Sequence, residues 1–210
     1  MPSPLYRICV FAAMFLWHSV TLSAQSDWAG ELSHWQAEMN ASFSDAKTSP
    51  LTPKALKKFK TLPFFKPDER FRVKATLIET PNTEPFEMPT STARKPLYRQ
   101  WGFLEFSLET QIFRVPVYYS ADIADSEGYE DYLFFPFTDR TSGSETYGGG
   151  RYLDVRLPAS GIEITVDFNR AYNPYCAYSE RYSCPIVPAE NFIDAEIRAG
   201  VMAPEKGKKH

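Results

Sequence analysis

The sequence RYLDVRLPASGIEITVDF, residues 151–168, decides the fold class. Apolar and polar residues alternate over residues 153–157, and they alternate again over residues 162–168. Alternation with a period of two is typical of a strand that buries one face and exposes the other. Residues 158–161, which include a proline and a glycine, favour a turn between the two strands. The pattern therefore predicts a β-hairpin.

The same strand pattern recurs on both sides of this hairpin. Further strands are expected near residues 70–79, 101–108, 111–119 and 192–198, and the continuously apolar residues 132–137 predict a strand buried on both faces. Together with the hairpin they give about seven strands, and a second hairpin is expected across residues 109–110. Short connections without alternating helices argue for a mainly β domain, an antiparallel sheet either curled into a barrel or folded as a sandwich. The periodicity does not choose between these two forms.

Residues 27–43 predict one N-terminal amphipathic helix. Its apolar side chains recur at helical intervals and form one stripe, made of Trp28, Leu32, Trp35, Met39 and Phe43. We expect this stripe to pack on the sheet. The alternative is an exposed face that binds another protein, as in a structural component of the cell envelope.

The first residues of the chain predict export. Residues 1–24 contain one positive charge at Arg7, an apolar stretch over residues 8–17 and the small residues Ser23 and Ala24 at the end. This order is typical of a secretory signal peptide that is too short for a comfortable membrane span. We therefore expect cleavage near Ala24, a periplasmic or secreted protein, and no stable membrane span after cleavage.

The rest of the chain divides into three parts. Residues 25–52 hold the helix and a linker, residues 53–203 form a single mainly β domain, and residues 204–210 form a short basic tail. The whole sequence has 23 lysines and arginines against 26 aspartates and glutamates, a formal net charge of −3. Because phosphate binding requires a concentrated basic face, this chain with dispersed cations is not expected to bind nucleic acid.

Loops rich in special residues are expected to form the functional site. Residues 138–150 are dense in glycine, serine and threonine, and residues 169–191 leave the sheet as an extended loop. Residues 80–96 form a proline-rich loop, which we expect to run without sheet pairing. We expect a cleft between these loops. The candidate ligand-binding residues are Asp139, Arg140, Glu145, Tyr147, Arg151, Asp167, Asn169, Arg170, Tyr172 and Asn173, and Tyr178 is expected to add to the aromatic lining.

Few chemistries fit these residues. After signal cleavage the histidines are His34 and His210, which lie outside the loops, so a serine or cysteine nucleophile with a histidine base is not expected. The same shortage of ligands argues against zinc, and no phosphate-binding loop motif is present. We therefore expect no metal and no cofactor.

Two functions remain, together with one purely structural interpretation. The leading prediction is a non-catalytic module that binds a small molecule or an envelope component. The alternative is a hydrolase that uses Asp139, Glu145 or Asp167 as acid or base, next to arginines that clamp an anion. In the structural interpretation, these charges pair with one another and hold two long loops in place.

Cys176 and Cys184 are expected to form a disulfide. Export implies an oxidising compartment, these are the cysteines that remain after signal cleavage, and their short separation lets a bent loop bring them together. The bond would staple the loop around Asn173 and Pro174. The alternative is a redox-active pair, which the spacing favours less because redox pairs usually lie closer, as in C-x-x-C.

Longer motifs carry a family resemblance. TSGSETYGGGRYLD at residues 141–154, DFNRAYNPYCAY at residues 167–178 and CPIVPAEN at residues 184–191 are similar to the signature of the bacterial domain of unknown function 1684 family. FKPDERFRVKA and PFEMPTSTARKP resemble its shorter, secreted members, so the likeness spans residues 56–200. The resemblance implies no particular chemistry.

Overall fold

The computed structural model describes residues 19–123 and 126–204 of the chain. These residues belong to two compact units, Met1–Glu38 and Met39–His210. Helix α1, Ser19–Ser44, supplies the described part of the first unit and ends in the second. Each unit is considered by itself.

The predicted signal peptide is only partly described. Residues 1–18 lie outside the described residues, and α1 begins at Ser19, before the predicted cleavage site at Ala24. In the described part of the chain, no helix is both long enough and apolar enough to cross a membrane.

The second unit is mainly β, as the alternating sequence predicted. Its strands are β1 (Arg72–Glu79), β2 (Phe86–Glu87), β3 (Leu97–Leu108), β4 (Gln111–Ser120), β5 (Tyr132–Asp139), β6 (Arg151–Arg156), β7 (Glu163–Asp167) and β8 (Phe192–Ile193). Its helices are short, namely α2 (Pro53–Leu56) and the 3₁₀ turns η1 (Glu69–Phe71), η2 (Phe168–Arg170), η3 (Tyr175–Ala177) and η4 (Ala189–Asn191). The strand expected over residues 192–198 is limited to its first two residues.

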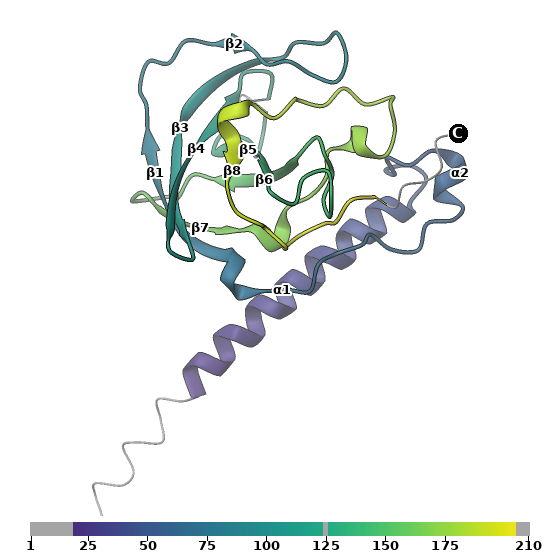
Figure 1. Ribbon diagram of the computed structural model, residues 1–210, viewed down its shortest axis with the longest axis horizontal. Coiled ribbons are helices and arrows are strands. Elements are labelled where there is room, and N and C mark those ends of the chain that lie inside the picture. The colour runs from purple at the N-terminus through teal and green to yellow at the C-terminus, as the bar shows by residue number, and fades with distance from the viewer. Residues whose placement is uncertain (1–18, 124–125, 205–210) are drawn as a thin grey trace, which may run out of the picture. The chain divides into compact units, whose positions relative to one another are not determined.

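One sheet contains all eight strands. Their order is β6-β5-β4-β3-β1-β7 with antiparallel neighbours, while β2 pairs with β3, and β8 pairs with β5 in parallel. The sheet curls into a half-barrel in which the long strands β3 and β4 form a curved wall (Figure 1). This confirms the curled antiparallel sheet and decides for the barrel-like form over a sandwich of two sheets.

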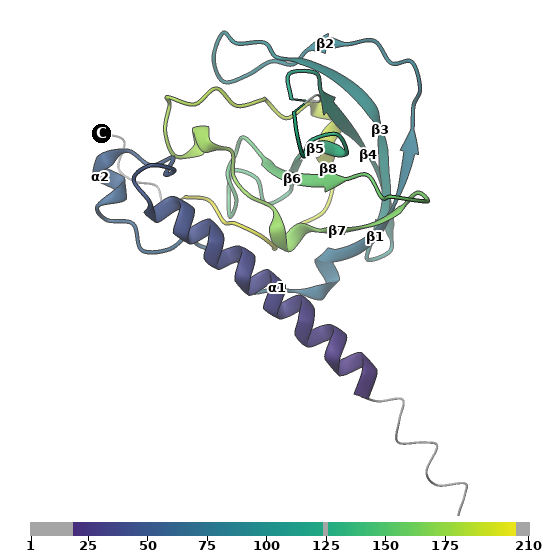
Figure 2. The ribbon, with the colours of Figure 1, turned by 180° about the vertical axis from the view of Figure 1, so that it is seen from behind.

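The hairpin predicted for residues 151–168 does not form, although both of its strands do. β6 pairs with β5, and β7 pairs with β1. The two strands therefore lie at opposite ends of the strand order (Figure 2). The N–H of Leu157 donates to the carbonyl of Asp131 at 2.8 Å. Past the turn, the carbonyl of Ile162 accepts the N–H of Leu77 at 2.7 Å. Alternation predicted the strands but not their partners, because any neighbouring edge satisfies a strand's backbone groups.

The second predicted hairpin, β3 and β4 joined at residues 109–110, is confirmed. The register shifts between Gln100 and Gly102, an irregularity that bends a strand. A Cβ atom at Gly102 would lie 2.1 Å from the carbonyl oxygen of Ile78. Glycine is therefore required where β1 approaches β3 this closely.

The proline-rich stretch over residues 80–96 is paired in the sheet, so the expectation that it lacks pairing is wrong. Strand β2 lies inside it, with Phe86 opposite Tyr98 of β3. Proline has no N–H to donate, but a short run without proline lies between Pro85 and Pro89. That run keeps its donors and adds a short edge strand.

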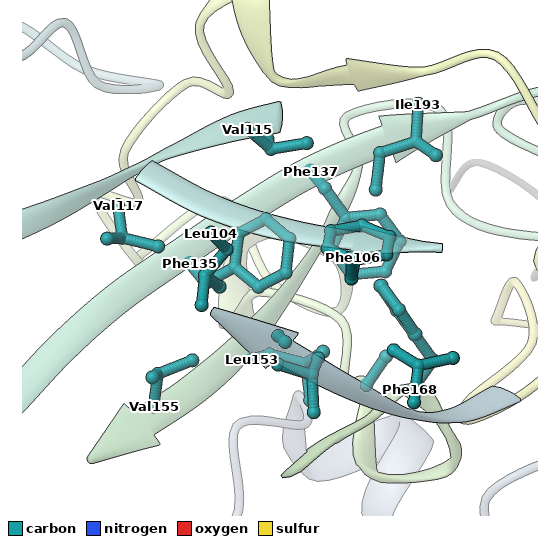
Figure 3. Packing of buried hydrophobic residues seen from close by; sticks show 14 of the residues in the cluster. Leu104, Phe106, Val115, Val117, Phe135, Phe137, Leu153, Val155, Phe168 and Ile193 are labelled. Carbon is teal, nitrogen blue, oxygen red and sulfur yellow. The ribbon is translucent and has the colours of Figure 1, made fainter. Parts of the chain in front are cut away.

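The inner face of the sheet holds the main hydrophobic core. Phe168, which follows β7 and is 0% exposed, packs among three other phenylalanines. Its ring centroid lies 5.3 Å from that of Phe137, 5.5 Å from that of Phe106 and 6.1 Å from that of Phe135. These tilted and edge-on contacts are the arrangements that aromatic rings prefer. Figure 3 shows the same rings with the aliphatic side chains Leu104, Val115, Val117, Leu153, Val155 and Ile193 around them.

The outer face of the same sheet carries a second, tyrosine-rich cluster. Its buried members are Met88, Tyr98, Tyr118, Phe134 and Tyr152. Tyr172 and Val187, from the segment after β7, pack against it. Both faces of the sheet are therefore covered, and loops cover the outer one.

The last turn of α1 belongs to the second unit and packs through Phe43. This side chain is 1% exposed and forms a third cluster with Leu62 and Val201. Its ring meets the ring of Tyr178 edge-on, with centroids 4.9 Å apart. Phe43 is thus a core residue, as expected, while the packing of the earlier stripe residues stays a prediction.

Replacing Phe168 should test the central role of this ring. Phe168→Ala removes a fully buried aromatic side chain and leaves a cavity, which typically costs about 3 to 5 kcal/mol. The matched control is Ile112→Ala on β4, where the side chain is 73% exposed and the change should be within about 0.5 kcal/mol. Urea denaturation of the three proteins measures both differences. Equal losses in the two variants would contradict the assignment of the core.

Candidate functional site

Asp139 and Arg151, two of the predicted site residues, form a buried ion pair. Asp139 ends β5 and Arg151 begins β6. Their side chains are 0% and 1% exposed, and Arg151 Nη2 lies 3.4 Å from Asp139 Oδ1. The hydroxyls of Thr141 and Ser142 also donate to this carboxylate, at 2.8 and 3.1 Å. The carboxylate is therefore enclosed by donors of the protein itself.

The same pair fixes the C-terminal segment. Arg151 donates to the carbonyl of Ile197 at 2.8 Å and to that of Ala199, and the N–H of Ile197 donates to Asp139 Oδ2 at 2.8 Å. The guanidinium also lies 5.1 Å from the ring centroid of Phe137. Ile197, which was predicted to lie in a strand, is thus held by the side chains of Asp139 and Arg151 instead of by a strand ladder.

Burial lowers the pKa of Arg151 to about 10, and the negative charge of Asp139 opposes that shift. The guanidinium accordingly stays protonated at neutral pH and requires a counter-charge inside the protein. Both side chains are used within the fold. They are structural residues, as in the interpretation that the loop charges pair with one another.

Two other predicted residues form exposed ion pairs. Arg140 Nε lies 2.6 Å from Asp194 Oδ1, and Arg198 Nε lies 2.8 Å from Glu145 Oε1. Both pairs join the loop after β5 to the C-terminal segment. They connect the same two parts of the chain at the surface that Asp139 and Arg151 connect in the interior.

The predicted polar residues after β7 hold the chain where it leaves the sheet. Asp167 Oδ1 accepts the N–H of Asn169 at 3.0 Å and caps η2, which ends at Arg170. The buried amide of Asn169 accepts the N–H of Asp68 and donates to its carbonyl, each at 2.9 Å. Asn173, also buried, donates to a backbone carbonyl of the C-terminal segment at 2.9 Å. These amides add to the backbone bridge between Tyr172 and Tyr152 in fixing the loop.

The three predicted loops meet around Cys176 and Cys184. The N–H of Ser91, from the proline-rich loop, donates to the carbonyl of Cys184 at 2.9 Å. The glycine-rich loop contributes Tyr147, which neighbours Cys176 and whose pKa is raised first by burial and then by that thiol. Both cysteines are free thiols in the structure. The disulfide between them stays a prediction.

Asp154 is a site residue that the sequence analysis missed. It lies on the outer face of β6 and is exposed. Two hydroxyls converge on one of its oxygens: Tyr132 donates to Oδ1 at 2.9 Å and Tyr172 donates to Oδ1 at 2.8 Å. Of the predicted candidates, Tyr172 is thus the one that helps to form an open polar site. Alternation marked Asp154 only as a solvent-facing residue, and its two partners become neighbours only in the folded chain.

Among the residues that the structure describes, Asp154 is not part of a direct ion pair, although Arg156 interacts with it electrostatically. The neighbouring cation, Arg156, is committed to Asp131, with Nη1 and Oδ1 2.6 Å apart. Over residues 19–123 and 126–204, no cation lies within ion-pair distance of Asp154 and no group donates to its Oδ2. The site therefore presents one net negative charge and one open acceptor.

The tyrosines beside Asp154 keep their protons. Burial, and then the negative charge of Asp154, raise the pKa of Tyr132 and Tyr172 above the ordinary value. Each phenol therefore remains a hydrogen-bond donor throughout the physiological pH range. Among the described residues, no group of three or more histidine, cysteine, aspartate or glutamate side chains is arranged to hold a metal ion.

Comparison with known proteins gives a family but no activity. The family described as "Protein of unknown function (DUF1684)" matches residues 57–202. The chain belongs to this family. The match covers the β unit and agrees with the resemblance found in the motifs. No curated protein matches the chain.

A solved relative shows the same fold. The solution NMR structure of an uncharacterised protein from Haloarcula marismortui is similar to this chain with 34% sequence identity and a TM-score of 0.68. The alignment covers 88% of this chain and 98% of that one. Haloarcula is an archaeon, so the likeness extends beyond the bacteria expected from the motifs.

Breaking the buried ion pair should destabilise the protein strongly. Asp139→Asn leaves the guanidinium of Arg151 buried without its counter-charge, which typically costs about 3 to 5 kcal/mol. Arg151→Met should cost a similar amount, and the double variant should cost less than the sum because the pair is coupled. The control Asp194→Asn removes an exposed pair and should cost less than about 1 kcal/mol. Denaturant unfolding measures all four, and additive losses would rule out the pair.

Proposed function

We propose that the protein is an exported, non-catalytic binding module whose ligand is a small organic cation held at Asp154. The observation that supports this proposal is the open carboxylate oxygen. Tyr132 and Tyr172 both donate to Oδ1, and no described group donates to Oδ2. A ligand N–H can occupy that position, and hydrogen bonds from a charged donor to a carboxylate are the strong ones.

Charge selects a cation over a neutral or anionic ligand. Because Arg156 is paired with Asp131, the charge of Asp154 is free to attract a positive ligand. Two neighbouring rings already hold a cation of the protein itself. The Arg156 guanidinium lies 5.7 Å from the ring centroid of Tyr129 and 5.5 Å from that of Tyr132. These tyrosine faces thus already accept one cation, as aromatic quadrupoles do.

The hydrolase alternative lacks a usable acid or base. Asp139 is buried and saturated by donors, Glu145 is paired with Arg198, and Asp167 caps a 3₁₀ turn. A general acid or base must reach a substrate proton, and each of these carboxylates has a structural task instead.

Export is part of the proposal and is supported by the sequence of residues 1–24. Helix α1 begins at Ser19, so cleavage near Ala24 would remove only its first residues. The remaining helix would still end at Ser44, within the second unit, which begins at Met39. The β unit would be released intact.

Binding can be tested with simple ammonium compounds. Tetramethylammonium, choline and cadaverine should raise the melting temperature of the full chain, because a ligand that binds only the folded state stabilises it by mass action. The neutral isostere of choline, 3,3-dimethylbutan-1-ol, should have no effect at the same concentration. Differential scanning fluorimetry followed by calorimetric titration measures the response.

Two variants locate the site. Asp154→Asn keeps the size of the side chain but removes its charge, and it should abolish the response to every ammonium compound. Asp194→Asn, which also removes an exposed carboxylate, should respond like the wild type. Absence of any response in the wild type, or an unchanged response in Asp154→Asn, would refute the proposal.

The exported form has its own measurement. Expression of the full sequence in a bacterial host should give a protein whose intact mass begins near Gln25 and which is recovered from the periplasm or medium. An intact Met1 in the purified protein, or recovery with the membrane fraction, would contradict export while leaving the binding site untouched.

A further inference from the structure

One edge of the sheet is open beside Asp154. β6 is the first strand of the order β6-β5-β4-β3-β1-β7, so β5 pairs with it on one side only. On its other side the described residues pair with it at one point, an isolated bridge between Tyr152 and Tyr172. The N–H of Tyr152 donates to the carbonyl of Tyr172 at 2.8 Å, and the N–H of Tyr172 donates back at 3.0 Å. The segment before Tyr172 forms η2 and does not extend this pairing.

The backbone groups of Asp154 and Arg156 point to this open side. The hydrogen-bonding groups of successive residues in a strand alternate between its two edges. Tyr152 directs both of its groups away from β5, as its bridge shows. Leu157 points the opposite way, because its N–H donates to the carbonyl of Asp131, next to β5. Asp154 and Arg156 lie two and four residues after Tyr152, so they share its direction.

These backbone groups form a short template for a further strand. Among the described residues, no bridge or turn uses the N–H or the carbonyl of Asp154 or Arg156. Both residues are exposed. The edge therefore presents two donors and two acceptors in the spacing of a ladder. Unpaired groups of this kind at an exposed strand edge are a site at which another chain can pair.

We propose that this edge binds an extended peptide segment as an added antiparallel strand, with a lysine of that segment opposite Asp154. This inference rests on the proposed cation site and names its ligand class: the organic cation is a lysine side chain within a peptide or protein. Strand addition takes its affinity from main-chain hydrogen bonds and its specificity from the side chains. The antiparallel direction is the one in which Tyr172 already pairs along the same edge.

Pairing at this edge would bring the lysine to the open carboxylate oxygen. A residue that exchanges both backbone bonds with Asp154 lies directly opposite it, with Cα atoms about 5.5 Å apart, and its side chain lies on the same face of the sheet. On that face Tyr132 and Tyr172 donate to Oδ1, and Oδ2 has no donor among the described residues. The lysine ammonium can donate to Oδ2 while its own backbone is paired. A free ammonium compound makes only the first contact.

The neighbouring residues restrict the sequence of the ligand. In an antiparallel pair, the residue two positions before the lysine lies opposite Arg156. Like charges directly opposite each other are destabilising, so an acidic residue is favoured there over a basic one. In the other direction Tyr172 already occupies the edge at Tyr152, so the bound strand must leave the sheet after its lysine. The expected pattern is an acidic residue, any residue and then lysine, within an extended segment.

The binding test uses the full-length protein and the capped peptide Ac-Thr-Glu-Val-Lys-Val-Thr-NH2. This peptide should bind at least about tenfold more tightly than N-acetyl-lysine N-methylamide, which carries the same cation without a strand. Two analogues separate the two contacts. Norleucine in place of lysine removes the charge, and a methyl group on the backbone nitrogen of the lysine removes a ladder donor. Each should weaken binding at least about fivefold.

Amide hydrogen exchange, followed by NMR, reports on the edge without any variant. With the peptide bound, the amide protons of Asp154 and Arg156 should exchange at least about tenfold more slowly, because they become donors in a ladder. The amide proton of Val155, which faces β5, is the internal reference and should change little. Unchanged exchange at Asp154 and Arg156 under saturating peptide would overturn strand addition.

A proline variant removes one donor of the edge. Arg156→Pro deletes an outward N–H at a place where a sheet edge tolerates proline, and Arg156→Gln loses the same side chain but keeps that donor. The proline variant should bind the peptide at least about fivefold more weakly than the glutamine variant. Thr165→Pro on β7 is the control. Its N–H faces away from β1, since Ile162, three residues earlier, faces Leu77, and it should bind the peptide like the wild type.

The outcomes separate this inference from the cation site on which it rests. If tetramethylammonium stabilises the protein but the peptide binds no more tightly than N-acetyl-lysine N-methylamide, the cation site stands and strand addition is refuted. Equal binding of the norleucine analogue would refute the lysine as the ligand of Asp154. Failure of both tetramethylammonium and the peptide to bind would refute both proposals.

Discussion

The folded state depends on finding partners for one buried cation, the guanidinium of Arg151. The guanidinium of Arg151 is 1% exposed, and an ion removed from water costs several kcal/mol unless the protein supplies substitutes. The substitutes come from separate parts of the chain: the carboxylate of Asp139 at the end of β5, and the carbonyls of Ile197 and Ala199 near the C-terminus. The half-barrel, the loop after β5 and the end of the domain are therefore joined at a single point.

One face of β6 packs in the main core, and the other carries the residues of the proposed site. Arg151, Leu153 and Val155 belong to the interior, while Tyr152 and Asp154 belong to the outer face. There the ring of Tyr172 meets the ring of Tyr152 edge-on, with centroids 6.0 Å apart. The proposed cation site lies on this outer face, and the Tyr152 hydroxyl donates to the carbonyl that follows Cys184. The proposed site thus depends on a loop that covers a sheet already stabilised from its other side.

The sequence predicts the local properties of this fold, such as the strands, but not the properties that depend on residues far apart in the chain, such as strand pairing and burial. Alternation is a local signal, so the strands and the curled antiparallel sheet were predicted, but the pairing of residues 151–168 was wrong because each strand found another edge. Asp139 and Arg151 were found by their charge, yet sequence does not reveal that both are buried. Asp154 was missed because two tyrosines from other segments, and not its own neighbours, give it a special environment.

The position of Arg151 in the chain has a consequence for biosynthesis. A nascent chain emerges from the ribosome with its N-terminus first, and domains generally fold as units. Strands β1 to β7 are complete at Asp167, but the carbonyls that Arg151 requires belong to residues 197 and 199. Until that segment has left the exit tunnel, the half-barrel holds a charge without its full set of partners. The last part of the domain to be synthesised therefore completes the surroundings of Arg151. A chain truncated before Ile197 has every long strand but lacks the two carbonyls that accept hydrogen bonds from this guanidinium.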